Sequence, residues 1–348
     1  MSETPRMKWF SVLASPFEIE GFPFYNEEKH FRRLMLNTVS PISPTVDELA
    51  WNTAGGKVRF RAKLQKLALR TRITVPHFFD HLTADAQCGF DCYADDGTGL
   101  KYYSTTRFDR SKTEYECTLF ELDETRELEI VINFPLYSGV SELLLGFDEA
   151  VVLSPPTPRS YDKNIIVYGS SITQGGCATR PGMAYTNILS RRLDAQVINL
   201  GFSGSGLAEA EIAVEIAKIP NAGLFLLDCE ANCHKPDWVA GHYPEFVRIL
   251  RESYPTTPIL LLTASPKNVE IFHRCEREYR AENKRIQREL VEERRRNGDA
   301  NIYFLDYEDI LGEEWQDETV DGTHATDLGF VYMANGLTPV IRNLLSLS

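Results

Sequence analysis

The chain has 348 residues, more than one typical compact domain holds, so we expect two domains. It carries 50 acidic and 37 basic side chains, and the formal net charge of −13 repels nucleic-acid phosphates and anionic membrane surfaces. No apolar run approaches the roughly 18 to 20 residues of a membrane span. Near the start, Glu3, Pro16 and Glu18 interrupt the apolar stretch that a secretory signal needs. The sequence therefore predicts a soluble cytoplasmic protein without a nucleic-acid or membrane partner.

The seven cysteines favour reduced thiols over a disulfide framework, because their number is odd and no secretion signal is predicted. Cys88 and Cys92 have CxxxC spacing, as do Cys229 and Cys233. A structural zinc site normally uses tighter CxxC hooks and four ligands in two clusters. We therefore expect buried thiols and no metal.

From about residue 10 to residue 150, apolar and polar side chains alternate, as they do in strands with one solvated face. The alternation is clear at 58–64, 67–75 and 128–134, and glycine-containing turns lie at 54–56 and 95–97. This pattern predicts an antiparallel all-β domain, a sandwich or jelly roll.

The stretch LSPPTPRSYDK, residues 153–163, contains three prolines, which central strands and helix interiors exclude. We place the domain boundary there. The predicted domains are residues 1–155, an accessory β-sandwich, and residues 156–348.

After this boundary, short continuous apolar runs take turns with amphipathic stretches, as in a parallel sheet buried on both faces. The runs are 164–169, 195–202, 222–230, 258–265 and 301–307. The sequence predicts a three-layer α/β/α domain, flavodoxin-like, with about five parallel strands. A helix with many charges is expected at 273–296, with a narrow apolar stripe of Cys275, Tyr279, Ile286 and Leu290 on an otherwise solvated surface.

In such sheets, ligands bind beyond the carboxyl ends of the strands. Ser171 follows the first apolar run, Gly204 the second and Asn232 the third, and Asp321 and His324 lie in the loop after the last. Ser171 can act as a nucleophile, His324 as its base and Asp321 as the group that orients the imidazole. The backbone amides of Ser171 and Gly204 and the side-chain amide of Asn232 can form an oxyanion hole.

Each of these residues also has a simpler interpretation. A serine in a strand-to-helix turn is more often a helix N-cap, and glycine-rich or Asp-Gly segments are usually turns. Their occurrence together at one predicted sheet edge favours a single site over separate coincidences.

These residues resemble those of the SGNH or GDSL-type hydrolases. Ser171, Gly204, Asn232 and His324 are similar to the four signature residues of that family. The segment GSSITQGGCATRPGMAY resembles its nucleophile segment, and DGTHATDLGF resembles its terminal Asp-x-x-His segment. The resemblance covers residues 164–348 and implies a three-layer domain that hydrolyses esters without metal or cofactor.

The first domain, with Gly89-Phe90-Asp91-Cys92-Tyr93, resembles the β-sandwich that precedes the catalytic domain in a carbohydrate-esterase-like, two-domain subgroup. Two positions depart from the family pattern. Ser170 stands where an Asp usually precedes the nucleophile, and Glu230-Ala231-Asn232-Cys233 replaces the usual Gly-x-Asn-Asp.

We therefore expect a serine esterase that cleaves short acyl groups, acetyl foremost, from a small-molecule or oligosaccharide ester. Arg180 and Tyr185 follow the nucleophile in a loop that is predicted to line the pocket. Transfer of the acyl group from serine to another alcohol is the alternative, and a homo-oligomer is compatible with the sequence.

Two rival interpretations belong to other classes. The order Gly201-x-x-Gly204-x-Gly206 after a predicted strand, with Asp228 ending the next run, imitates a dinucleotide-binding fingerprint in a different glycine order. A catalytically inactive sugar-binding protein is the other rival. Ser203 and Ser205 are alternative nucleophiles.

Overall fold

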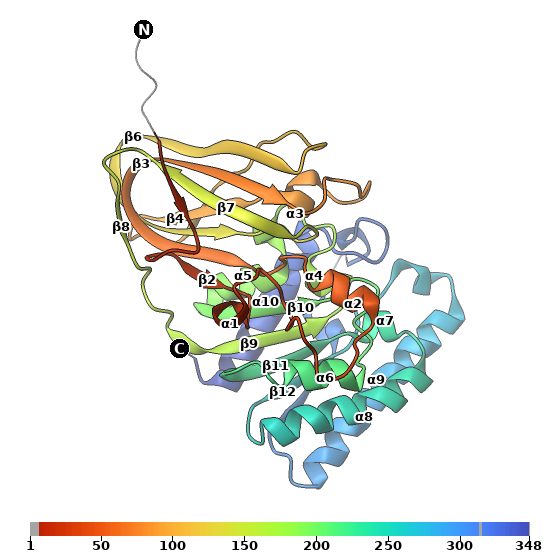
Figure 1. Cartoon of the computed structure of the whole chain (residues 1–348). Coiled ribbons are helices and arrows are strands. Elements are labelled where there is room, and N and C mark those ends of the chain that lie inside the picture. The colour runs from red at the N-terminus through yellow and green to blue at the C-terminus, as the bar shows by residue number, and fades with distance from the viewer. Residues whose placement is uncertain (1–6, 313–314, 348) are drawn as a thin grey trace.

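The computed structural model describes residues 7–312 and 315–347, which form an antiparallel sheet beside a parallel sheet with helices (Figure 1). The antiparallel sheet has eight strands in the order β1-β7-β3-β6-β4-β5, and β2 and β8 both pair with β3. Its strands are β1 (Lys8–Ser11), β2 (Glu18–Glu20), β3 (Lys57–Ile73), β4 (Asp91–Asp95), β5 (Lys101–Thr105), β6 (Glu114–Asn133), β7 (Val140–Phe147) and β8 (Val152–Ser154). The predicted all-β character is confirmed.

Strand β3 joins the two alternating runs that were predicted at 58–64 and 67–75. Its pairing with β6 shifts register between Leu64 and Lys66 and again between Leu67 and Ala68. Such an irregularity adds a residue to one strand and reverses which side chains face the core. The apolar positions accordingly change from even to odd numbers, from Leu64 to Leu67, within one continuous strand.

Three short helices were not predicted in this part of the chain. They are α1 (Tyr25–Glu28), α2 (Pro44–Leu49) and α3 (Ala84–Cys88). Helices α2 and α3 have side-chain N-caps, since Ser43 accepts a hydrogen bond from the Val46 N–H and Thr83 from the Ala86 N–H.

The second sheet has five parallel strands in the order β10-β9-β11-β12-β13. The strands are β9 (Tyr161–Gly169), β10 (Ala195–Gly201), β11 (Ala222–Asp228), β12 (Ile259–Leu262) and β13 (Ile302–Leu305). Each lies within or overlaps one of the five predicted apolar runs, because strands covered on both faces need apolar side chains at successive positions.

Helices cover both faces of this sheet, so the predicted three-layer arrangement is confirmed (Figure 1). One core cluster joins the sheet to α6 (Ala210–Ile216), α8 (Pro236–Ser253) and α9 (Arg274–Arg296), and α9 packs beside α8 and over β13. The other joins it to α5 (Tyr185–Leu193) and α10 (Asp327–Leu345).

The apolar stripe that was predicted along α9 differs from the one observed. Cys275 and Tyr279 are exposed, whereas Asn283, Gln287 and Val291 are buried. Both amides donate hydrogen bonds to the segment after β11, to the His234 carbonyl and to Glu230, and these bonds offset the cost of burying them. Polar partners, which a hydrophobicity pattern does not record, therefore set the orientation of this helix.

The two parts of the chain share a hydrophobic core near the carboxyl end of β9. Leu136 and Tyr137 of the first part pack in one cluster with Val167 and Ile172 of the second. The buried guanidinium of Arg33 donates at 2.6 Å to the carbonyl of Gly201, the last residue of β10. The all-β part therefore extends to the sheet edge where ligands bind in parallel α/β folds. Across 7–312 and 315–347, no helix has the length and apolarity needed to cross a bilayer.

Candidate active site

The segment after β9 turns sharply into α4 (Ser171–Gln174). Ser170 caps this helix, because its Oγ accepts a hydrogen bond from the Ile172 N–H at 3.2 Å. A Cβ on Gly169 would lie 2.0 Å from the Thr173 hydroxyl, so only glycine fits before the cap. The serine that replaces the usual Asp thus supplies an ordinary N-cap, and Ser171 becomes the first residue of the helix.

Ser171 lies at one end of a hydrogen-bonded chain of three side chains. The Ser171 Oγ is 2.8 Å from Nε2 of His324, although the two residues are 153 positions apart. Nδ1 of the same imidazole is 2.7 Å from Oδ2 of Asp321. The structure brings the three predicted residues together in the order hydroxyl, imidazole, carboxylate.

Asp321 is held in its own loop as well as by the imidazole. Its Oδ1 accepts hydrogen bonds from the backbone N–H groups of Thr323 and His324, at 3.0 and 2.8 Å. Partial burial alone would raise the pKa of this carboxyl, but the hydrogen bonds and the nearby imidazole lower it below its ordinary value. An ionised Asp321 favours the imidazole tautomer with its proton on Nδ1.

The predicted oxyanion donors come from three neighbouring strand ends. Gly204 lies in an exposed turn after β10 with φ of +67°, a conformation that favours glycine. Within the described ranges, the backbone N–H groups of Ser171 and Gly204 have no hydrogen-bond partner. Nδ2 of Asn232 reaches the same turn, at 3.2 Å from the carbonyl of Phe202 and 3.4 Å from that of Gly206.

Asn232 lies on the short helix α7 (Glu230–Cys233), which a buried carboxylate fixes. Oε2 of Glu230 accepts hydrogen bonds from the Ala264 N–H at 2.8 Å and from Nε2 of Gln287 at 2.7 Å. Burial raises the pKa of Glu230 despite these donors. The departure from the usual Gly-x-Asn-Asp therefore puts an anchored side chain, Glu230, where the family pattern has glycine.

Comparison with known proteins agrees with this geometry. Residues 162–342, more than half of the chain, match the model of the GDSL-like lipase/acylhydrolase family. The chain belongs to this family. Residues 7–153 match a second model, which describes the N-terminus of SGNH-hydrolase-type esterases.

Solved structures of similar fold extend over the whole chain. A Bacteroides ovatus protein described as a GDSL-like lipase is 30% identical, with 99% of each chain covered and a TM-score of 0.90. A salicylyl-acyltransferase from a tetracycline biosynthetic pathway is 18% identical, with 97% of each chain covered and a TM-score of 0.77. A family two carbohydrate esterase from Cellvibrio japonicus is 15% identical, with 99% of each chain covered and a TM-score of 0.64. No curated protein matches the chain.

The glycines that imitate a dinucleotide fingerprint pack against the nucleophile segment of this family member. A Cβ on Gly201 would lie 2.1 Å from the backbone nitrogen of Gln174, and one on Gly206 would lie 2.1 Å from the carbonyl oxygen of Gly169. Close packing within the protein therefore accounts for both glycines without a bound dinucleotide.

Arg180 and Tyr185, predicted to line the pocket, have other partners. Arg180 donates to Oδ2 of Asp91 at 2.8 Å and to the Tyr93 hydroxyl at 2.6 Å, so it ties the nucleophile loop to the GFDCY segment. Tyr185 is fully buried, and its hydroxyl donates to Oδ2 of Asp228 at 2.7 Å. These contacts give both side chains structural roles, and their part in substrate binding stays a prediction.

Sequence reasoning missed two residues of the first domain that lie at this site. The Tyr137 hydroxyl donates to the carbonyl oxygen of Ser171 at 3.3 Å. The His81 ring centroid lies 6.1 Å from that of His324. No local pattern marks either residue, because their importance comes from packing between distant parts of the chain.

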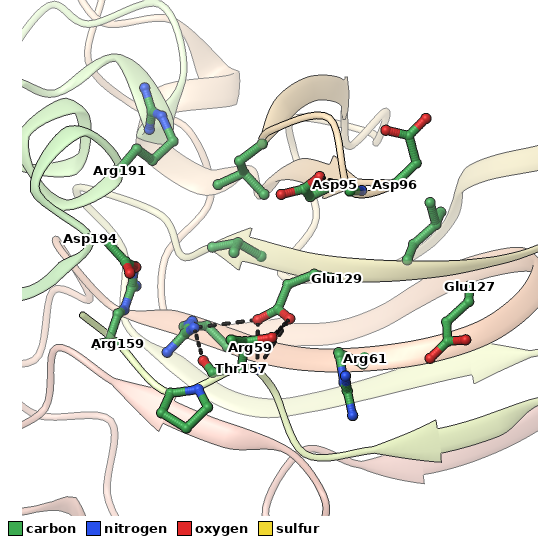
Figure 2. Close-up of a pocket in the computed structure, with 15 residues that line it drawn as sticks. Arg59, Arg61, Asp95, Asp96, Glu127, Glu129, Thr157, Arg159, Arg191 and Asp194 are labelled. Atoms are coloured by element: carbon green, nitrogen blue, oxygen red, sulfur yellow. Dashed lines mark hydrogen bonds and ion pairs between the residues drawn. The ribbon is translucent and has the colours of Figure 1, made fainter.

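A cavity of about 640 Å³ lies apart from these residues, between β4, β6, the 157–159 stretch and the end of α5 (Figure 2). Charged side chains line much of it, and Figure 2 shows Arg59 paired with Glu129 and with Thr157. None of Ser171, Asp321 and His324 lines it. We therefore assign the candidate active site by its side-chain geometry rather than by the volume of this cavity.

All seven cysteines are free thiols, and five of them are buried. Burial raises the pKa of Cys88 and of Cys177 to about 12, so these thiols are protonated at neutral pH. In the part of the chain that the structure describes, no three His, Cys, Asp or Glu side chains gather as metal ligands.

Proposed function

We propose that the protein is a serine esterase that removes short acyl groups, acetyl foremost, from carbohydrate esters through an acyl-serine intermediate. The observation that carries the proposal is the continuous chain of hydrogen bonds from Ser171 through His324 to Asp321. A serine hydroxyl is a weak nucleophile unless a base accepts its proton, and here an imidazole nitrogen lies within reach.

The reaction has two halves. His324 accepts the proton of Ser171 at Nε2 while the serine oxygen attacks the ester carbonyl, and then gives that proton to the departing alcohol. Water, activated by the same imidazole, releases the acid and restores the serine. Asp321 stabilises the imidazolium in both halves and takes no proton itself.

The negative charge that develops on the carbonyl oxygen needs preorganised donors. The free N–H groups of Ser171 and Gly204 fit this role, and the Asn232 amide adds a third donor. Both hydrogen bonds that this amide makes in the structure are long. An oxyanion would replace one of them at small cost.

The substrate class rests on the resemblance to carbohydrate esterases. The family two esterase from Cellvibrio japonicus shares the fold over the whole chain. We assign catalysis to residues 156–348 and an accessory role to residues 1–155.

The test is acid release from p-nitrophenyl esters of increasing chain length and from acetylated oligosaccharides. We expect the highest kcat/KM for acetyl esters, and we expect Ser171→Ala to fold normally and lose turnover. Ser203→Ala is the matched control and should keep its activity. Near-normal turnover by Ser171→Ala would refute the proposal.

Acyl transfer is the second candidate, and the fold shared with the salicylyl-acyltransferase favours it. The same acyl-serine would then pass its acyl group to an alcohol instead of water. Adding candidate alcohols to the ester-cleavage reaction separates the two, since a transferase yields acylated alcohol in place of free acid. A purely sugar-binding protein would yield neither product and would not react with a serine-directed phosphonate.

A further inference from the structure

The first domain carries a row of three aromatic side chains whose inner end lies near the candidate catalytic histidine. The rings of Phe78 and Phe79 have centroids 4.1 Å apart, and those of Phe79 and His81 are 5.5 Å apart. The His81 ring in turn lies 6.1 Å from the ring of His324. We call Phe78, Phe79 and His81 the aromatic wall.

A buried glutamine fixes the backbone of this wall. Oε1 of Gln87, a fully buried residue, accepts hydrogen bonds from the N–H groups of Phe78 and Phe79, each at 3.2 Å. Phe79 also packs edge-on against Tyr137, with ring centroids 5.7 Å apart. The wall is therefore anchored to the same residue that donates to the Ser171 carbonyl.

The side chains of Phe78 and His81 are exposed to solvent, although the backbone of the wall is held by hydrogen bonds. The relative exposure of Phe78 is 60%. The His81 side chain is 40% exposed, and only its Nδ1 is paired, with Asp80 at 3.2 Å. Among the described residues, Nε2 of His81 has no partner and is free to bond a hydroxyl group. Phe79 lies between the exposed ring of Phe78 and the imidazole of His81, so the apolar face and the polar contact belong to one continuous row of rings.

The position of the wall relates it to one side of the scissile bond. The candidate oxyanion donors belong to Ser171 and to the segments that follow β10 and β11, whereas His324 hands its proton to the departing alcohol. His81, the inner end of the wall, is the member that lies near the ring of His324, and we infer from this that the wall faces the alcohol side of the ester.

We propose that the aromatic wall binds the alcohol part of the substrate, a pyranose ring or a similar cyclic polyol. The apolar face of the sugar ring lies on Phe78, and one hydroxyl group bonds Nε2 of His81. The same surface holds the acceptor alcohol if the acyl group is transferred. This proposal rests on the proposed function and gives the first domain a part in substrate choice.

The test compares two acetyl esters that differ only in their alcohol. Vinyl acetate has an alcohol part too small to cover the wall, whereas an acetylated methyl glucoside covers it. We expect Phe78→Ala and His81→Ala to lower kcat/KM for the glucoside ester at least about tenfold more than they lower kcat/KM for vinyl acetate. Phe78→Trp should restore the glucoside activity.

Tyr103→Ala is the control, because it removes another half-exposed aromatic ring of the first domain, one packed on Phe120. Equal losses on the two esters, or no loss on the glucoside ester, would overturn the proposed role of the wall. Vinyl acetate cleavage by the wild-type protein tests the esterase itself. If the wild-type protein did not cleave vinyl acetate, the proposed esterase function would be overturned, and the role of the wall with it.

Discussion

The Thr173 hydroxyl, two residues after Ser171, donates a hydrogen bond of 2.7 Å to the fully buried carboxyl of Asp228 at the end of β11. Tyr185 of α5 donates to the same oxygen, also at 2.7 Å. One carboxyl thus joins the nucleophile helix, a central strand and a covering helix. Burial raises its pKa to about 6 despite both donors.

This raised pKa predicts how the stability of an Asp228→Asn variant depends on pH. The folded protein retains a proton that the unfolded chain releases between pH 4 and 6, so wild-type stability falls as the pH rises through this window. The asparagine side chain is never ionised, so the variant avoids the cost of a charged carboxylate at this buried position. We expect the variant to be more stable than the wild type by roughly 1–3 kcal/mol at pH 8, with the difference vanishing near pH 4. Urea unfolding at the two pH values measures this, and a pH-independent loss of stability would contradict it.

A second buried carboxylate joins the all-β part of the chain to the α/β part. Glu20 of β2 accepts hydrogen bonds from Arg59 at 2.8 Å and from Arg159 at 2.7 Å, and Arg159 also bonds Asp194 at the end of α5. Burial alone would raise the pKa of Glu20, but Arg159 and the other cations around it lower the pKa to about 2.

We expect Glu20→Gln to cost roughly 3 kcal/mol at pH 7, because it removes the buried negative charge that Arg59 and Arg159 share and leaves them only their more exposed partners, Glu129 and Asp194. The lowered pKa means that the wild-type advantage is full above about pH 4.5 and declines toward pH 2. Chemical unfolding across this range tests both statements. Glu121→Gln, at an exposed ion pair with Lys66, is the control and should change stability by less than about 1 kcal/mol. If both substitutions changed the free energy of unfolding equally, Glu20 would contribute no more than a surface ion pair does.

The Asn232 amide predicts a specific kinetic effect. If it stabilises the oxyanion, Asn232→Ala should lower kcat about a hundredfold or more and leave KM within a few-fold of wild type. Steady-state kinetics on acetyl esters provide the measurement. A variant that raises KM while kcat is unchanged would instead assign the amide to substrate binding.

Much of the second domain follows directly from the sequence, since the five apolar runs predict β9 to β13. Continuous burial leaves a strong signal in the chain. Helix α10 likewise buries apolar residues at helical spacing, Phe330, Met333 and Leu337. The sequence also places Ser171 and His324 at one sheet edge, where the structure brings them within hydrogen-bond distance.

What could not be predicted depends on side chains that meet from distant positions. Arg180 follows the nucleophile closely, yet its partner Asp91 lies 89 residues earlier in the first domain. His81 and Arg33 reach the second domain from a region that shows only alternating strands. Periodicity records which face of an element is buried but not which side chains of another domain cover it.

The most direct test of the account is the site at which a serine-directed phosphonate attaches. Mass spectrometry of the labelled, digested protein should place the label on Ser171, and His324→Ala should slow labelling by several orders of magnitude. A label on Ser203 or Ser205, or labelling of Ser171 at an unchanged rate without the imidazole, would contradict the assignment.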